Sequence, residues 1–299
     1  TCSLFTYTRM RGSRPTGHVL ALVVVLGRNE VRDMTREIGE HFVRVTDAKE
    51  WAQAAVVGVP KDSVVVGFSA AAIWGMPLPP SVAQVLKSVP VSLSRREAAA
   101  AIRRPRVDGH SIDLPADHCA MNESLVLTTP ARTWVDCAAL LPAEHLLAMG
   151  DWALARGLLT LDEIKAIVTW ARGRRGVVRA REVLPWIRTG VESAQESRLR
   201  WHIVADHLPE PEINPEIVLP GRRLVRLDLA YRGLRIALEF DGEWHFHTQE
   251  HDAQRRRELM DAGWKLIVAT KEDLLHPSGV LTMIRAGIAE RSSIGKRRW

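Results

Sequence analysis

Two strand-like segments that carry acidic side chains place the strongest constraint on the fold of this chain. The segments run from Arg223 to Tyr231 and from Leu234 to Asp241, with Arg232-Gly233 between them. A short link that contains glycine, between two such segments, predicts a β-hairpin. Because side chains alternate between the two faces of a strand, each segment presents one apolar and one mixed face.

Three carboxylates lie on the mixed face of this predicted hairpin. If the link is a two-residue turn, Asp228 lies opposite Ala237, and Glu239 is its diagonal neighbour at roughly 7–8 Å. Asp241 lies two residues further along the same face. Carboxylates in an apolar setting need partners or a cation. Oxygen ligands on adjacent strands suit Mg²⁺, which binds one or two carboxylates and keeps several waters.

The segments beside the hairpin offer further candidates and one alternative. Glu196 lies on the predicted helix from Ala194 to Leu208, three residues before Leu199 on the face expected to pack on the sheet. His245 follows the second strand closely enough for acid–base or water-positioning work. The alternative is that Arg226 and Arg235 pair with the acids as solvated ion pairs. A second alternative is a zinc site, which the spacing of three histidines allows: His245, His247 and His251.

The order of elements after residue 190 predicts a mixed sheet with helices. A helix is expected from Gln249 to Ala262, closed by Gly263, and a strand from Trp264 to Ala269. Thr270, with Asp273 three residues on, predicts a capped final helix. The order α-β-β-α-β-α defines an α/β (α+β) fold class.

The motifs of this region resemble a known family of nucleases. The spacing Asp228-x10-Glu239-x-Asp241, and then Asp252-x2-Arg255 followed by Gly263-Trp264, resembles the very-short-patch-repair (Vsr) endonucleases and related bacterial proteins. Both belong to the PD-(D/E)XK superfamily. The resemblance covers residues 191–275 and implies a restriction-endonuclease-like mixed sheet flanked by helices.

The resemblance implies a metal-dependent site for phosphodiester hydrolysis with Mg²⁺ or Mn²⁺. Asp228 and Glu239 match the metal-binding pair, and Glu196 matches the acid of the first helix. Asp241 stands where the superfamily usually has lysine; with Glu196, it is expected to hold metal-bound water or a second cation. His245 would orient the nucleophile or leaving group. Arg255 and Arg256, on the helix that follows, would contact phosphate. The alternative is that these two arginines pair with Asp252 and the sheet carboxylates.

The Vsr-type structural zinc site is not expected here, because no cysteine lies beyond Cys137. Three cysteines without a CxxC pair fit a reducing, cytoplasmic setting. No apolar run reaches the roughly 18 residues of a membrane helix, so no membrane partner is expected. The oligomeric state is not encoded in any of these patterns.

Residues 31–190 predict a mixed, largely helical domain. Val64–Val66 is strand-like, a short helix follows with Ser69 as its cap, and Thr129-Pro130 starts another helix. Residues 142–186 are expected to be helical, with breaks near Gly157 and Gly173. The region resembles bacterial proteins with an AbiE-type abortive-infection antitoxin region, through three segments: Val64–Leu78, Thr128–Asp136 and Asp151–Leu154. The domains are thus 1–30 (a basic-then-apolar segment that need not be native), 31–190 and 191–299.

The charge distribution favours DNA as the partner. Residues 1–190 hold 24 basic and 18 acidic side chains, a difference of +6, whereas residues 191–299 hold 17 of each. The excess predicts that the N-terminal region contacts phosphates, through Arg103 and Arg104 among others. The expected function is a DNA endonuclease in repair or defence. The alternative is a regulatory or antitoxin-like DNA-binding protein whose nuclease fold is weak or inactive.

Overall fold

The computed structural model describes residues 52–53, 55–85, 90–96, 100–105, 107–241 and 249–296. Contacts divide the chain into two compact units, Thr1–Arg44 and Val45–Trp299, and all described residues belong to the second. They form helices, two sheets of mixed strand direction and one antiparallel two-stranded sheet. The predicted α/β class is therefore confirmed. No helix of these residues is long and apolar enough to cross a membrane.

The first sheet has the strand order β3-β2-β1-β5-β4. Its central strand, β1, is the β-branched segment that the sequence predicts as a strand. β1 pairs parallel with β5 and antiparallel with β2. The strands are β1 (Ser63–Val65), β2 (Val91–Arg95), β3 (Val107–Gly109), β4 (Cys119–Asn122) and β5 (Leu125–Thr128). The helix after β1 is α3 (Gly67–Ile73), and its N-cap is Val66. The prediction of Ser69 as the cap is wrong, because Ser69 Oγ instead accepts a hydrogen bond from the Ser92 amide at 3.0 Å.

The short helix α4 (Pro80–Val85) was not predicted, whereas the helix that starts at Thr129 and the helical stretch of residues 142–186 are found where the sequence predicts them. Thr129 caps the first of them, its side chain accepting from the Arg132 amide, with Pro130 in the first turn. The predicted breaks are confirmed, since Gly157 and Gly173 have φ values of 65° and 79°. These helices are α4 (Pro80–Val85), α5 (Pro130–Cys137), α6 (Ala143–Ala155), α7 (Leu161–Trp170) and α8 (Val177–Val183), the last followed by the 3-10 turn Leu184–Trp186.

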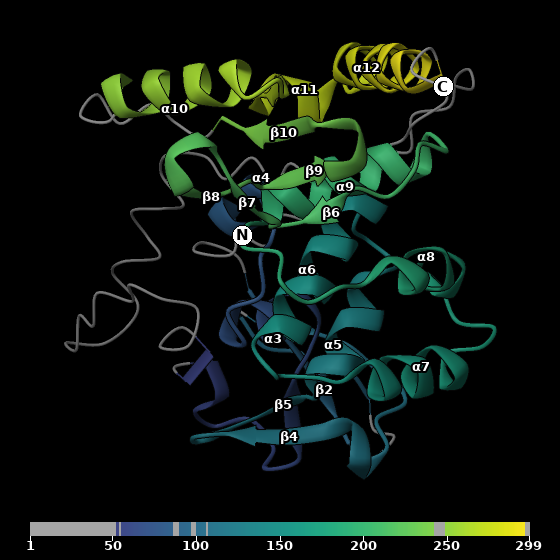
Figure 1. Ribbon diagram of the computed structural model, residues 1–299. Coiled ribbons are helices and arrows are strands. Elements are labelled where there is room, and N and C mark those ends of the chain that lie inside the picture. The colour runs from purple at the N-terminus through teal and green to yellow at the C-terminus, as the bar shows by residue number, and fades with distance from the viewer. Residues whose placement is uncertain are drawn as a thin grey trace, which may run out of the picture. The chain divides into compact units, whose positions relative to one another are not determined.

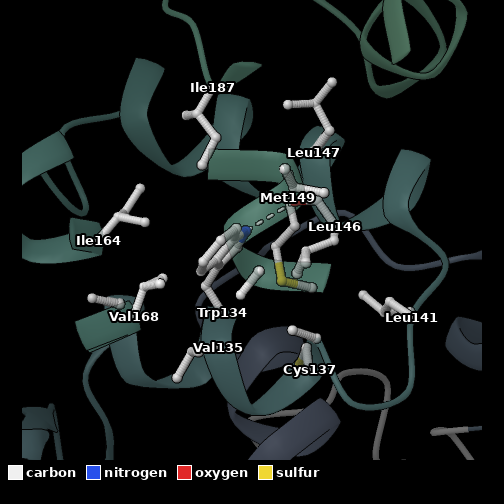
Figure 2. Packing of buried hydrophobic residues seen from close by; sticks show 14 of the residues in the cluster. Trp134, Val135, Cys137, Leu141, Leu146, Leu147, Met149, Ile164, Val168 and Ile187 are labelled. Atoms are coloured by element: carbon white, nitrogen blue, oxygen red, sulfur yellow. Dashed lines mark hydrogen bonds between the residues drawn. The ribbon is translucent and has the colours of Figure 1, made fainter. Parts of the chain in front are cut away.

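Trp134 lies at the centre of the helical core (Figure 2). Its side chain is fully buried, and its Nε1 donates to the Leu146 carbonyl at 2.9 Å, which satisfies the one polar atom of the indole. Met149 and Ile187 lie nearby in the same cluster. The core thus joins α5 to α6 and to the segment that leads out of the helical region.

The second sheet has the strand order β11-β10-β9-β6, and its strands β6, β9 and β10 are labelled in Figure 1. Of the predicted acids, Glu239 lies in β10, Asp228 just before β9 and Asp241 just after β10. Leu229, Ile236 and Leu238 pack with α9, α11 and α12 on one face. Ala230 and Ala237 pack with Leu259 of α10 on the other. The elements are α9 (Ala194–Ala205), β6 (Glu212–Ile213), β9 (Leu229–Tyr231), β10 (Ile236–Phe240), α10 (Gln249–Asp261), β11 (Lys265–Ala269), α11 (Lys271–Leu275) and α12 (Ser278–Lys296).

The predicted hairpin exists, but its register differs. β9 and β10 are antiparallel with Tyr231 opposite Ile236, not Leu234. The connection is a 3-10 turn (Arg232–Leu234) followed by Arg235 in the left-handed conformation at φ 51°. The longer connection shifts the pairing by two residues. Extending the pairs beyond Leu229 and Leu238 brings Asp228 opposite Glu239 rather than Ala237.

The predicted strand from Arg223 to Tyr231 is two strands. Its first half, β8 (Leu224–Arg226), leaves the main sheet and pairs with β7 (Glu216–Val218) as a separate two-stranded ribbon. Its second half is β9. Asp228 therefore lies at the junction of ribbon and sheet.

A buried ion network crosses the predicted domain boundary at residue 190. Asp151 on α6 and Arg200 on α9 are 1% and 0% exposed, and Arg200 Nη2 donates to Asp151 Oδ2 at 2.7 Å. Ser197 Oγ donates to the same oxygen at 2.7 Å, and the Arg188 amide to Oδ1 at 2.8 Å. The other arm of Arg200 donates to Glu210 at 2.8 Å. The helical region and the second sheet are thus joined through α6 and α9.

Candidate functional site

The structure brings three of the predicted acids together at one end of the second sheet. Glu196 lies in the first turn of α9, Asp228 just before β9, and Glu239 in β10. The Asp228 charge raises the pKa of both Glu196 and Glu239, so Asp228 is the electrostatic neighbour that the two glutamates have in common. Asp241 follows the end of β10.

Asp228 is fixed by the backbone of the neighbouring strand. Its Oδ2 accepts a hydrogen bond from the Phe240 amide at 2.9 Å, beyond the last ladder pair of β9 and β10. Burial raises the pKa of Asp228 and Glu192 adds to the rise, while the Phe240 amide and Arg255 oppose it. The carboxylate is therefore oriented by the sheet itself.

Glu239 is the most buried acid of the sheet, with 7% of its surface exposed. Arg255 of α10 donates from Nη1 to Glu239 Oε2 at 2.9 Å. The Arg255 Nη2 lies 2.6 Å from Oε1, but its hydrogen bond goes to the Arg226 carbonyl at 2.7 Å. Among the described residues, Glu239 Oε1 is consequently buried without a hydrogen-bond donor. Burial raises the pKa of Glu239, the Asp228 charge adds to the rise, and Arg255 opposes it.

Glu196 is held by the cap of its own helix. Ser193 Oγ accepts from the Glu196 amide at 3.1 Å, and Glu196 Oε2 accepts from the Glu192 amide at 3.2 Å. The Asn214 side chain donates to the same oxygen at 3.3 Å. Burial is the largest cause that raises the pKa of Glu196, ahead of the charge of Asp228. The carboxylate is thus buried, oriented and biased toward its protonated form.

The arginines of the site come from α10 rather than from the strands. Arg226 pairs with Glu192 at 2.7 Å, and Arg235 donates to the Ala262 carbonyl at 3.3 Å, so the alternative in which both pair with the site acids is wrong. Arg255 pairs with Glu239, and Arg256 pairs with Asp241 at 3.1 Å. The alternative in which the α10 arginines bind the sheet carboxylates is therefore the arrangement found.

The remaining predicted residues lie elsewhere. Arg103 and Arg104 are exposed in the segment that leads to β3 of the first sheet, and Arg104 donates to the Val57 carbonyl. His245 lies outside the described residues. His247 does too, so the structure does not describe the predicted zinc alternative.

Two residues that orient Glu196 were missed by the sequence interpretation. The spacing Ser193-x-x-Glu196 is a capping pattern and could have shown that the glutamate is tied to its own cap. Asn214 carries no such signal, because it is 18 residues away and reaches Glu196 only through the fold.

The oxygen donors of the site suit a hard cation, with one restriction. Mg²⁺ takes one or two carboxylates and completes its shell with water. Asp228 and Glu239 offer such a pair, and because Glu239 Oε1 lies 2.6 Å from the Arg255 Nη2, a cation would share that oxygen with the guanidinium or displace it. Within the described part of the chain, however, no three acidic, histidine or cysteine side chains are close enough to form a metal centre by themselves. Any cation here would rely on two protein carboxylates and water.

The fold and site define an α/β protein with a buried carboxylate cluster at the end of a mixed sheet. Two Mycobacterium tuberculosis proteins, uncharacterized protein Rv2248 and uncharacterized protein MT2308, are each 36% identical to this chain over 157 residues. The match covers 52% of this chain and 58% of each relative, so the chain spans little more than half of their length. No family model matches the chain, and no solved structure does.

Proposed function

We propose that this protein is a metal-dependent endonuclease that hydrolyses phosphodiester bonds in DNA. The observation that carries the proposal is the position of Asp228 opposite the buried Glu239 and beside Glu196, so that its charge raises the pKa of both glutamates. Buried like charges are costly to fold around, and groups with perturbed pKa values cluster at functional sites. The Vsr-like spacing of the acids adds independent support.

The cation would be held by Asp228 and Glu239. Bound there, Mg²⁺ or Mn²⁺ supplies a Lewis acid for the phosphate and lowers the pKa of a coordinated water. The Phe240 amide keeps the Asp228 carboxylate in place. Glu239 is fixed by its strand and by Arg255, so the carboxylate pair is already oriented before a ligand arrives.

The other residues act on the substrate and its protons. Glu196, with its raised pKa and two hydrogen bonds to Oε2, is suited to accept a proton from a water at the site. Arg255 and Arg256 hold carboxylates in this structure, and either guanidinium can exchange that contact for the two oxygens of a singly charged phosphodiester. The α10 helix would then supply the contacts that keep the backbone of DNA over the acids.

The second candidate is a DNA-binding protein with an inactive nuclease fold. It is favoured by one observation: Arg255 and Arg256 already neutralise Glu239 and Asp241. In addition, the resemblance expects a lysine at position 241. Under this second hypothesis the site is a stable ion-pair cluster, and the protein binds DNA without cleaving it.

Cleavage of plasmid, mismatched and branched DNA with Mg²⁺ or Mn²⁺ tests the two candidates. Nicking by the wild-type chain is expected, with complete loss in Glu239→Ala. Glu272→Ala is the matched control, because Glu272 is an exposed acid on α11. Equal cleavage by wild type and Glu239→Ala would contradict the proposed mechanism. Binding without cleavage on every substrate would favour the second candidate.

A further inference from the structure

A single arginine covers the most buried acid of the candidate site. Arg255 Nη1 donates to Glu239 Oε2 at 2.9 Å, and Arg255 Nη2 lies 2.6 Å from Glu239 Oε1. Nη2 also donates to the Arg226 carbonyl of β8 at 2.7 Å, which ties the guanidinium to the backbone as well. Both oxygens that a ligand of Glu239 would need are thus occupied by one side chain.

Asp228, the other acid of the pair, is open by comparison. It is partly exposed, and its hydrogen bond from the Phe240 amide uses Oδ2. A hard divalent cation that keeps several waters binds one or two carboxylates. Such a cation can reach Asp228 in the present arrangement, but it reaches Glu239 only where Arg255 gives way, because two positive charges on the same oxygens repel each other. Arg255 and a divalent cation therefore exclude each other on Glu239.

Arg255 can leave Glu239 without a change in the fold. Its side chain is 27% exposed, so the guanidinium has a path to solvent by side-chain rotation. Its helix is held independently, since Leu259 of α10 is fully buried and packs with Ala230 and Ala237 of the sheet. A guanidinium that leaves a carboxylate needs another pair of anionic oxygens. The two non-bridging oxygens of a phosphodiester offer such a pair.

Arg255 is also the arginine that acts on both acids of the pair by direct position. Burial raises the pKa of Asp228 and of Glu239, and the charge of Arg255 opposes the rise in both. Arg226 also acts on Asp228, but its own partner is Glu192 at 2.7 Å, and its side chain is about half exposed. Arg255 is thus the cation that the pair has in the free protein.

We propose that Arg255 closes the cation site of the free protein and opens it when a phosphodiester of DNA takes its guanidinium. Cation binding and DNA binding are then coupled, and each strengthens the other by the same factor. Without DNA, the protein offers a cation Asp228 alone. With DNA, it offers Asp228 and Glu239 together. This inference rests on the proposed function, because it takes the same site and the same class of substrate.

The first test is a calorimetric titration of the full chain with Ca²⁺, which also binds through carboxylate oxygens. Arg255→Gln removes the competing guanidinium, so its Kd for Ca²⁺ should be about tenfold lower than that of wild type, as for loss of one charge-assisted contact. Arg255→Lys keeps the charge but does not cover both oxygens, so its Kd should lie between the two. Circular dichroism checks that each variant is folded.

Two matched controls separate direct blocking from a general loss of positive charge. Arg226→Gln removes an exposed charge that also acts on Asp228, and Arg257→Gln removes an exposed arginine of the same helix whose Nε donates to the Ala253 carbonyl. Both should stay within about twofold of wild type in their Kd for Ca²⁺, since salt screens exposed charges. A tenfold tightening in Arg226→Gln, equal to that in Arg255→Gln, would overturn the proposal.

The second test repeats the titration with a 20-base-pair duplex present. The duplex alone serves as the blank, and a gel checks that it stays intact. Because the duplex takes Arg255 from Glu239 in wild type, the roughly tenfold gap between wild type and Arg255→Gln should close to within about twofold. A gap of the same size with and without duplex would overturn the coupling to DNA.

The outcomes separate this inference from the endonuclease proposal. A gap that closes with duplex supports the inference even in a chain that cleaves no DNA, in which case the endonuclease proposal fails alone. Cleavage by wild type, with equal Ca²⁺ affinity in wild type and Arg255→Gln, overturns the inference and leaves the endonuclease. Weaker Ca²⁺ binding by Arg255→Gln than by wild type would show that Arg255 only supports the carboxylates, and it overturns the inference, as does a lack of Ca²⁺ binding by both chains.

Discussion

Two buried carboxylates, Asp151 in the helical region and Glu239 in the second sheet, each face an arginine but are satisfied very differently. Asp151 accepts three hydrogen bonds over its two oxygens, from Arg200, Ser197 and the Arg188 amide. Glu239 accepts one, from Arg255 Nη1, and its Oε1 lies 2.6 Å from the Arg255 Nη2, whose hydrogen bond goes to the Arg226 carbonyl. The first acid is held by three separate groups, whereas the second depends on a single arginine.

Their electrostatic neighbours differ in the same direction. Burial raises the pKa of both acids. For Asp151 the other contributions, from Arg200, the Arg188 amide and Ser197, all oppose the rise. For Glu239 the charge of Asp228 adds to it. A buried carboxylate surrounded by donors stabilises a fold, whereas one beside another carboxylate indicates a site.

The largest expected effect is on the complete network. Asp151→Ala leaves Arg200 buried with one carboxylate fewer, which should lower the free energy of unfolding by about 3–5 kcal/mol. Urea denaturation measures it. Asp162→Ala, which removes an exposed partner of Lys165, is the control and should cost less than about 1 kcal/mol. A loss below about 1 kcal/mol for Asp151→Ala would show that the network is not structural.

Next in size is the effect of a divalent cation on the incomplete site. At a concentration of about 100 times its Kd, Mg²⁺ should stabilise the wild-type chain by about 2.7 kcal/mol, because it binds only the folded state. Thermal unfolding with and without Mg²⁺ reads this out without any substrate. The stabilisation should vanish in Glu239→Gln but persist in the exposed control Glu272→Gln. An equal shift in both variants would place the cation elsewhere.

The pH dependence of stability gives a smaller effect. Because the pKa of Glu239 is raised in the folded state, its contribution favours folding fully below the ordinary glutamate pKa of 4.5 and is lost as the pH rises through the folded value. Glu239→Gln should therefore lose less stability than wild type between pH 4.5 and pH 7, by on the order of 1 kcal/mol. Denaturation midpoints at several pH values test this, and a steeper loss in the variant would reverse the sign of the argument.

The smallest effect should be the same in both regions. Thr160 and Thr270 each cap a helix in a full capping box, one in the helical region and one after the second sheet. Replacing either by alanine should cost about 0.5–1 kcal/mol. If denaturation shows similar losses of unfolding free energy for both variants, the two regions differ only in their buried acids. Unequal losses would indicate a general difference in stability between the regions.

Local chemistry explains which elements could be predicted from the sequence. The caps at Thr129 and Thr270 and the left-handed Gly263, at φ 79°, are confirmed. Each depends on one side chain and the few residues around it. Strand alternation predicted that Asp228 and Glu239 share a face, and the helix position three residues before Leu199 predicted that Glu196 lies near the sheet.

Long-range geometry explains what could not be predicted. The hairpin register depends on Arg235 at φ 51°, a conformation that usually calls for glycine and that nothing in the sequence signals. The division of one predicted strand into β8 and β9 depends on the pairing of β8 with β7. The sequence interpretation predicted no strand at β7, because it ended the preceding helix at the prolines around residue 210. The Asp151–Arg200 contact joins residues 49 positions apart and follows only from how α6 meets α9.

The network across residue 190 also has a consequence for how such chains can be rearranged by recombination. A segment that starts at residue 191 carries Arg200 and Glu210 but leaves Asp151 behind, so a buried guanidinium keeps only one of its two carboxylates. Exchange of the part after residue 190 between genes would keep this network whole only where the donor also brings α6, or where the recipient helix offers an acid at the position of Asp151. The unit that must stay together is therefore larger than the second sheet and its acids, and it includes α6.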